Sequence, residues 1–287
     1  MREYPVASRF LEAVLPRKKL GFGLKEWIWW DHFRAIDPVN SLKEVIVNKG
    51  LKVLLVTVMG LSVVGFVRAQ EETVSLTPLT EAAEGLDLQA VCELFKESEG
   101  LEEFEQSLNQ PENGINNLDL DENGDVDYIR VVEEAAEGTH LVVLQVPIAE
   151  NEFQDVAAIE IEKADDDEIN LQVHGNEVLY GPDYYVYPSA GRISTWPIVL
   201  RLYGPAYRPY RSPFRFGYYP TWWRPRPIVR VNIYRTRIAP LRGRTSYRVV
   251  RTSRIRNIHR VRYSPRVSPR VRRAVRRRVR RRPPRRR

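Results

Sequence analysis

Residues 116–132 read NNLDLDENGDVDYIRVV, an oxygen-rich loop that runs directly into a hydrophobic, β-branched segment. Gly124 stands where a calcium loop of the EF-hand type makes its sharp turn, at loop position 6. The side-chain ligand positions 1, 3, 5 and 9 of such a loop are occupied by Asp119, Asp121, Asn123 and Asp127. Because oxygen ligands at this spacing suit a hard cation, the sequence predicts a Ca²⁺ site here.

The loop departs from a complete EF-hand in several respects. Asp125 stands at position 7, where a backbone carbonyl is the usual ligand, and we include this residue in the predicted ligand set. Position 12, which is a bidentate Glu in EF-hands, is Arg130. The residues after the loop read as a strand and not as a helix. An alternative interpretation is an Asx-rich turn that opens a hairpin without metal, since Asp, Asn and Gly favour turns.

Around this loop the sequence predicts an α+β fold, with two short helices followed by an antiparallel β-meander of four or five strands. A helix over residues 88–96 can be capped by Asp87, and a second helix over 101–110 is stopped by Pro111. Alternation of apolar and polar residues indicates strands at 126–134, 139–148, 155–163 and 169–173. A Gly-Asn pair at 175–176 is a hairpin signal before a short strand at 178–179.

Charge divides the chain into two unlike parts. Residues 71–180 contain 30 Asp or Glu and three Lys or Arg, whereas residues 181–287 contain 31 Arg, no Lys and one acidic residue. The basic part also holds 14 of the 20 prolines, interleaved with Tyr and Trp. This composition predicts a largely disordered Arg/Tyr/Pro-rich tail, with short β-like pieces at 228–233 and 247–250.

The end of the tail, RVRRAVRRRVRRR at 270–282, places Val271, Val275 and Val279 on one helical stripe. Arginine pairs bidentately with phosphate, sulfate or carboxylate, so we expect a helix that forms on a polyanion. The predicted polyanion contacts are Arg270, Arg272, Arg273, Arg276, Arg277, Arg278, Arg280, Arg281 and Arg282. The alternative is that the tail neutralises the acidic part of its own chain, or of a neighbour by self-association.

A secretory signal peptide is predicted ahead of the acidic part. Lys49 and Lys52 precede an uncharged apolar run at 53–67, and cleavage is expected after Ala69. Because 48 residues precede this basic cluster, we expect translation to begin at Val47. The alternative is an inner-membrane signal anchor, for which the run is shorter than the roughly 20 residues of a spanning helix.

Five segments summarise the predicted organisation. They are an upstream extension at 1–46, a signal peptide at 47–69, a linker at 70–85, an acidic α+β domain at 86–180 and a basic low-complexity tail at 181–287. The single cysteine, Cys92, excludes an internal disulfide and shares a helical face with apolar residues, so we expect a buried thiol. His140 and His174 have no partner motif, and no catalytic motif is present in the sequence.

Residues 116–132, together with 86–98 and 139–163, resemble a group of uncharacterised secreted proteins of Bacteroidetes-type bacteria. The resemblance covers about residues 86–182 and implies export without implying an activity. In that group the region after the domain is rich in Tyr, Trp, Pro and His, whereas Arg replaces much of it here.

Together these patterns predict a non-enzymatic exported protein of the periplasm, cell envelope or extracellular matrix that binds Ca²⁺. Its expected partners are acidic polysaccharide, lipid A phosphates or extracellular DNA, reached through the tail, and no small-molecule substrate is inferred. A nucleic-acid-binding or condensing protein is the alternative, which requires that the leader be misread. An enzyme that uses the abundant carboxylates is a third hypothesis, and it requires a concave site.

Overall fold

The computed structural model of the chain describes residues 78, 80, 83–164 and 168–281. All of them belong to one compact unit, Glu71–Arg287. The predicted upstream extension, the signal peptide, most of the linker and Arg282 lie outside the described residues. Within the described ranges, no helix has both the length and the apolar character needed to cross a membrane.

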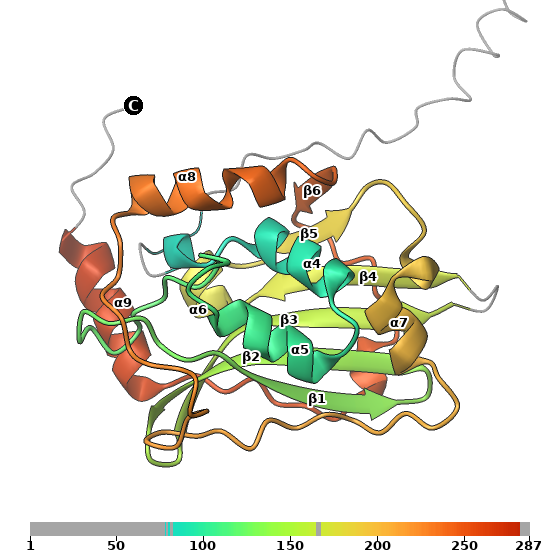
Figure 1. Ribbon diagram of the computed structural model, residues 1–287, viewed down its shortest axis with the longest axis horizontal. Helices are drawn as coiled ribbons and strands as arrows, with labels where there is room; N and C mark the ends of the chain where they lie inside the picture. Colours follow the sequence, from blue (N-terminus) through green and yellow to red (C-terminus); the bar gives the residue numbers. More distant parts are fainter. Residues whose placement is uncertain (1–77, 79, 81–82, 165–167, 282–287) are drawn as a thin grey trace, which may run out of the picture. The chain divides into compact units, whose positions relative to one another are not determined.

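The described residues form an α+β fold built on a six-stranded antiparallel sheet (Figure 1). The strands lie in the sheet in their sequence order, so the predicted antiparallel meander is confirmed, with six strands where four or five were expected. The first four strands are β1 Arg130–Ala136, β2 Thr139–Ala149, β3 Glu152–Lys163 and β4 Ile169–Gly175. The last two, β5 Tyr185–Pro188 and β6 Tyr247–Val250, come from the basic half of the chain.

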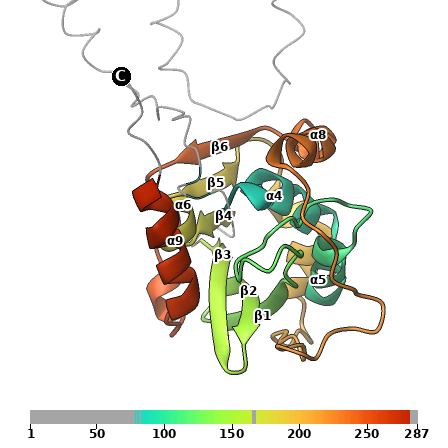
Figure 2. The same ribbon diagram turned by 90° about the vertical axis from the view of Figure 1, so that its left-hand side faces the viewer.

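Four helices of the described part lie on one side of this sheet (Figures 1 and 2). They are α4 Leu88–Glu97, α5 Leu101–Asn109, α7 Pro197–Leu202 and α8 Val231–Arg242, of which α4 and α5 confirm the two predicted helices. The carboxylate of Asp87 caps α4 by accepting hydrogen bonds from the N–H groups of Gln89 and Ala90, at 3.0 and 3.1 Å. Between helices and sheet lies the main core, where the rings of Phe95 and Phe104 meet edge to face. Cys92 is fully buried in that core, as expected.

Two segments predicted as β are wholly or partly helical in the structure. Residues 178–179 lie in α6, Glu177–Tyr180, because the side chain of Asn176 accepts a hydrogen bond from the N–H two residues later and caps a helical turn. Residues 228–230 are extended without joining the sheet, and 231–233 begin α8, whose apolar stripe is buried against α4. Burial of that stripe outweighs the β propensity of Ile and Val in this stretch.

The expectation of a largely disordered tail is wrong, because residues 197–278 are structured and pack on the acidic part. Many of the tail's aromatic and aliphatic side chains reach apolar surface left open by the first half. Buried examples are Trp196, Trp223, Tyr234, Val261 and Val271. The strand at 247–250 is confirmed as β6. The predicted C-terminal helix is present as α9, Pro269–Arg281, but it packs Val271 and Val275 on the protein's own core and does not need a polyanion to form.

The basic half also covers the free edge of β1. The N–H of Glu133 donates to the carbonyl of Tyr210 at 2.8 Å, and the N–H of Ser212 donates to the carbonyl of Val131 at 2.9 Å. An uncovered edge strand can pair with a strand of another chain, and residues 210–212 occupy part of the edge of β1.

On the other side of the sheet, the chain between β6 and α9 packs Val261 against Leu141 and Val143 of β2. Helix α9 then crosses one end of the sheet beside α6 (Figure 2). This is the end that carries the acidic loop, so the C-terminal helix and the predicted calcium loop become neighbours.

Candidate metal site and arginine surface

The acidic loop, residues 119–127, lies between α5 and β1, and its carboxylates accept hydrogen bonds from backbone N–H groups of the loop itself. Both oxygens of Asp119 accept hydrogen bonds at 3.1 Å, one from the N–H of Asn123 and one from the N–H of Gly124. Asp121 also accepts a bond from the N–H of Asn123, at 3.1 Å. Gly124 has φ +91°, which an L side chain rarely adopts, so the turn at position 6 depends on glycine.

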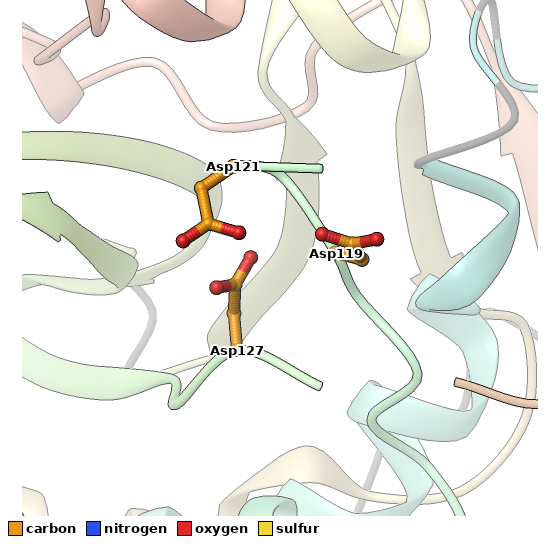
Figure 3. Close-up of side chains that lie close together, drawn as sticks. All are labelled: Asp119, Asp121 and Asp127. Carbon is orange, nitrogen blue, oxygen red and sulfur yellow. The ribbon is translucent and has the colours of Figure 1, made fainter. Parts of the chain in front are cut away.

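Asp127 closes the site from the far end of the loop. Its Oδ2 accepts a hydrogen bond from the N–H of Leu120 at 2.6 Å, and its own N–H donates to the carbonyl of Leu118 at 2.8 Å. The carboxylates of Asp119, Asp121 and Asp127 point toward one another, with ligand oxygens within 4.8 Å (Figure 3). These three side chains could hold a metal ion.

The electrostatics of the cluster favour a bound cation. Burial raises the pKa of Asp127 well above its ordinary value of 3.8, and the charges of Asp121 and Asp119 raise it further. Burial is also the main cause that raises the pKa of Asp119, with a contribution from Asp121. A cation between the three carboxylates would offset the repulsion among their negative charges. It would also compensate for the water that the buried carboxylates have lost.

The remaining predicted ligands behave differently. The side-chain oxygen of Asn123 accepts a hydrogen bond from the N–H of Asp125 at 2.7 Å, and its amide nitrogen donates to Asp121 at 3.0 Å. The carboxylate of Asp125 is not part of the three-carboxylate cluster. Arg130 opens β1, and its guanidinium donates to the carbonyl of Ser212 at 2.7 Å, so loop position 12 supplies no carboxylate.

Contacts that the sequence did not predict hold the loop to the basic half. The N–H of Val126 donates to the carbonyl of Arg226 at 2.7 Å, and the N–H of Ile228 donates to the carbonyl of Gly124 at 3.1 Å. Asn117 exchanges two hydrogen bonds with the backbone of Val229, at 2.8 and 2.9 Å. The loop is therefore shaped by residues about one hundred positions later in the chain, which no local pattern shows.

Helix α9 contacts the same loop through Glu122. This carboxylate forms ion pairs with Arg277 at 2.8 Å and with Arg278 at 3.0 Å. Glu122 has φ +65°, a left-handed backbone conformation that is uncommon for residues other than glycine.

The other predicted arginine contacts divide into paired and unpaired side chains. Arg270 pairs with Glu152 at 3.1 Å. Arg272, Arg273 and Arg276 are exposed, and among the described residues none of them has an ion pair within 4.0 Å, although the charge of Arg273 helps to lower the pKa of Glu152. Val271 and Val275 are buried on the opposite side of the helix, so α9 presents an arginine surface, which we define as Arg272, Arg273 and Arg276. The side chains of Arg280 and Arg281 are not described.

Buried carboxylates of the acidic half find their partners in the basic half. Glu162 accepts hydrogen bonds from the N–H groups of Arg256 and Asn257, at 3.1 and 3.0 Å. Asp155 accepts bonds from the hydroxyl of Tyr263 and the N–H of Arg266, both at 2.6 Å. Backbone N–H groups and tyrosine hydroxyls, more than guanidinium groups, thus satisfy these acids.

A groove of about 580 Å³ lies on the outer face of the sheet, beside the segment 258–265. It includes Glu160 and His174, which contact each other at 3.1 Å, and His174 stacks on Tyr185 with centroids 4.3 Å apart. The second oxygen of Glu160 accepts a hydrogen bond from Gln172 at 2.6 Å. Both of its oxygens thus have partners, which is typical of a structural carboxylate.

Comparisons of the chain with protein-family models, with curated proteins and with solved structures found no match.

Proposed function

We propose that this protein is an exported, non-enzymatic Ca²⁺-binding protein that binds polyanions through the arginine surface of α9. The observation that carries the proposal is the two-sided character of α9. Val271 and Val275 anchor the helix in the core, while Arg272, Arg273 and Arg276 are exposed without ion pairs to the described residues. Three guanidinium groups on a fixed helix are arranged for anion binding before the partner arrives, which lowers the entropic cost of binding.

Calcium is the ion that the chemistry of the cluster favours. Asp119, Asp121 and Asp127 offer oxygen ligands only, at the spacing of a calcium loop, and Ca²⁺ takes 6–8 oxygens from carboxylates, carbonyls and water. Because position 12 is Arg130, the bidentate ligand is missing. We therefore expect weak binding, near the 10⁻⁴–10⁻³ M range of extracellular modules.

Export rests on the predicted signal peptide and on the resemblance to secreted proteins. Outside the cytoplasm, the polyanions that a guanidinium surface can meet carry sulfate, carboxylate or phosphate groups. Acidic polysaccharide, lipid A phosphates and extracellular DNA all satisfy this description.

Retention on a heparin column tests the proposal, with the salt concentration at elution as the measurement. The variant Arg272→Gln/Arg273→Gln/Arg276→Gln should elute at clearly lower salt than the parent protein, because its arginine surface is removed. A matched control lowers the charge equally at three exposed arginines elsewhere, Arg192→Gln/Arg208→Gln/Arg251→Gln. Equal losses in the two variants would show only a dependence on net charge and would overturn the assignment to α9.

A further inference from the structure

Residues 211–224 carry a second exposed surface that the metal site and α9 do not use. Arg215 and Tyr218 exchange backbone hydrogen bonds at 3.0 and 2.9 Å, which closes a tight hairpin. Gly217 has φ +73°, so the turn depends on glycine at this position. Phe216 therefore stands at the tip of an ordered turn.

The hairpin is fixed to the body of the protein by an inner set of aromatic rings. The ring of Tyr128, next to Asp127 in sequence, is buried and contacts the rings of three residues from this segment. The centroid distances are 5.6 Å to Phe214, 5.6 Å to Tyr219 and 5.3 Å to Trp223. Aromatic pairs of this geometry stabilise beyond the area they bury, so the turn is held in place from below.

An outer set of aromatic side chains remains in solvent. The exposed fractions are 47% for Phe216, 53% for Tyr218 and 44% for Trp222. Single exposed apolar residues are ordinary, but three exposed aromatic side chains within seven positions of one ordered segment are more than scattered exposure accounts for. We call these three residues the aromatic tip.

Basic side chains flank the aromatic tip, whereas the carboxylates of Asp121 and Asp127 lie near Tyr219 of the inner set. The guanidinium of Arg215 lies over the ring of Tyr218, 4.9 Å from its centroid. Arg224 donates only to the backbone carbonyls of Thr221 and Trp223. Neither arginine has an ion pair with a described carboxylate, and the sequence has no Asp or Glu after Asp183.

We infer that the aromatic tip inserts into the headgroup region of an anionic lipid bilayer, with Arg215 and Arg224 on the lipid phosphates. Tryptophan and tyrosine favour the membrane–water interface because their rings have both apolar and polar parts. Basic residues near an anionic bilayer add to the binding. The tip and α9 consist of different residues, so this surface does not depend on the polyanion proposal.

Vesicle flotation with the fragment 71–287 tests the inference. This fragment is the compact unit that contains all described residues, and it excludes the apolar run at 53–67. Vesicles of phosphatidylcholine alone are compared with vesicles of equal parts phosphatidylcholine and phosphatidylglycerol. The parent for this assay carries Arg272→Gln/Arg273→Gln/Arg276→Gln, so that the arginine surface of α9 does not contribute. In this parent, Phe216→Ser/Tyr218→Ser/Trp222→Ser should lower partitioning onto the anionic vesicles by at least about tenfold. The control Leu200→Ser changes an apolar side chain that is 61% exposed on α7 and should bind like the parent fragment.

Tryptophan fluorescence gives an independent readout. The fragment has three tryptophans, of which Trp196 and Trp223 are buried and Trp222 is exposed. Anionic vesicles should shift the emission to the blue in the parent fragment, and Trp222→Phe should abolish the shift while keeping most of the binding. Circular dichroism establishes that each variant is folded.

Vesicle binding that survives the triple substitution would overturn the inference, as would a blue shift that persists without Trp222. Soluble acidic polysaccharide is the second probe in the same assays. If polysaccharide binding requires the aromatic tip and vesicle binding does not, the surface is a glycan site and the bilayer assignment is wrong.

Discussion

Removing one hydroxyl group in the basic half should destabilise the whole fold. Tyr234 of α8 is 1% exposed, and its hydroxyl accepts a hydrogen bond from the N–H of Asp87 at 2.8 Å. The same hydroxyl donates to the carbonyl of Ile115 at 2.9 Å. It therefore joins the residue that caps α4 to the segment that leads into the acidic loop.

Tyr234→Phe keeps the ring but leaves both backbone groups without this partner. A buried polar group without a hydrogen bond costs about 1–3 kcal/mol, and the Asp87 N–H is only partly buried, so we expect a loss of about 2–4 kcal/mol. For a domain of this size that loss lowers the melting temperature by roughly 5–15 °C.

Urea unfolding followed by circular dichroism measures the loss directly. The control is Tyr218→Phe, which removes a hydroxyl from a side chain that is 53% exposed and should change stability by less than about 0.5 kcal/mol. A Tyr234→Phe variant as stable as the parent would refute the view that the basic half is part of the cooperative fold.

Three further outcomes follow from the loop and its surroundings. Calcium at 100 times its Kd should stabilise the parent by about 2.7 kcal/mol in thermal melts. Asp127→Asn should abolish most of that gain, whereas Asp125→Asn, outside the cluster, should keep it. Because the folded pKa values of Asp127 and Asp119 are raised above 3.8, the metal-free folded state retains protons that the unfolded chain has lost. Metal-free stability should thus decline as pH rises from 3.8 through those raised values, and melts in saturating calcium should lack this decline. Gly85→Ala should cost about 1–3 kcal/mol in urea unfolding, because the new Cβ would lie 2.3 Å from the carbonyl oxygen of Asn117. Gly243→Ala, with no atom closer than 3.8 Å, should be tolerated.

Local sequence patterns were sufficient to predict the helices and strands of the first half of the fold. The Asp87 cap, the apolar stripes of α4 and α5 and the alternation in β1–β4 each act over a few residues, and the sequence shows them directly. The carboxylates at loop positions 1, 3 and 9 converge for the same reason, since the turn at Gly124 brings them together.

The second half depends on contacts that sequence spacing does not encode. Glu160 and Glu162 alternate with apolar residues in β3, a pattern that is typical of a solvated face. In the structure both side chains are buried, because the chain after β6 crosses that face. A high content of Pro and Arg is typical of disorder, but composition does not show that Trp223 and Tyr234 each meet a matching apolar surface.

The order of the strands has a consequence for how the protein is made. Because each of the first four strands pairs with its successor, this part can assemble while the nascent chain is still emerging from the ribosome. Glu162, however, meets the N–H of Arg256 only after 94 more residues have been released. Folding can therefore be completed only after the last hundred residues have been released, and until then the face of β3 that carries Glu162 remains uncovered.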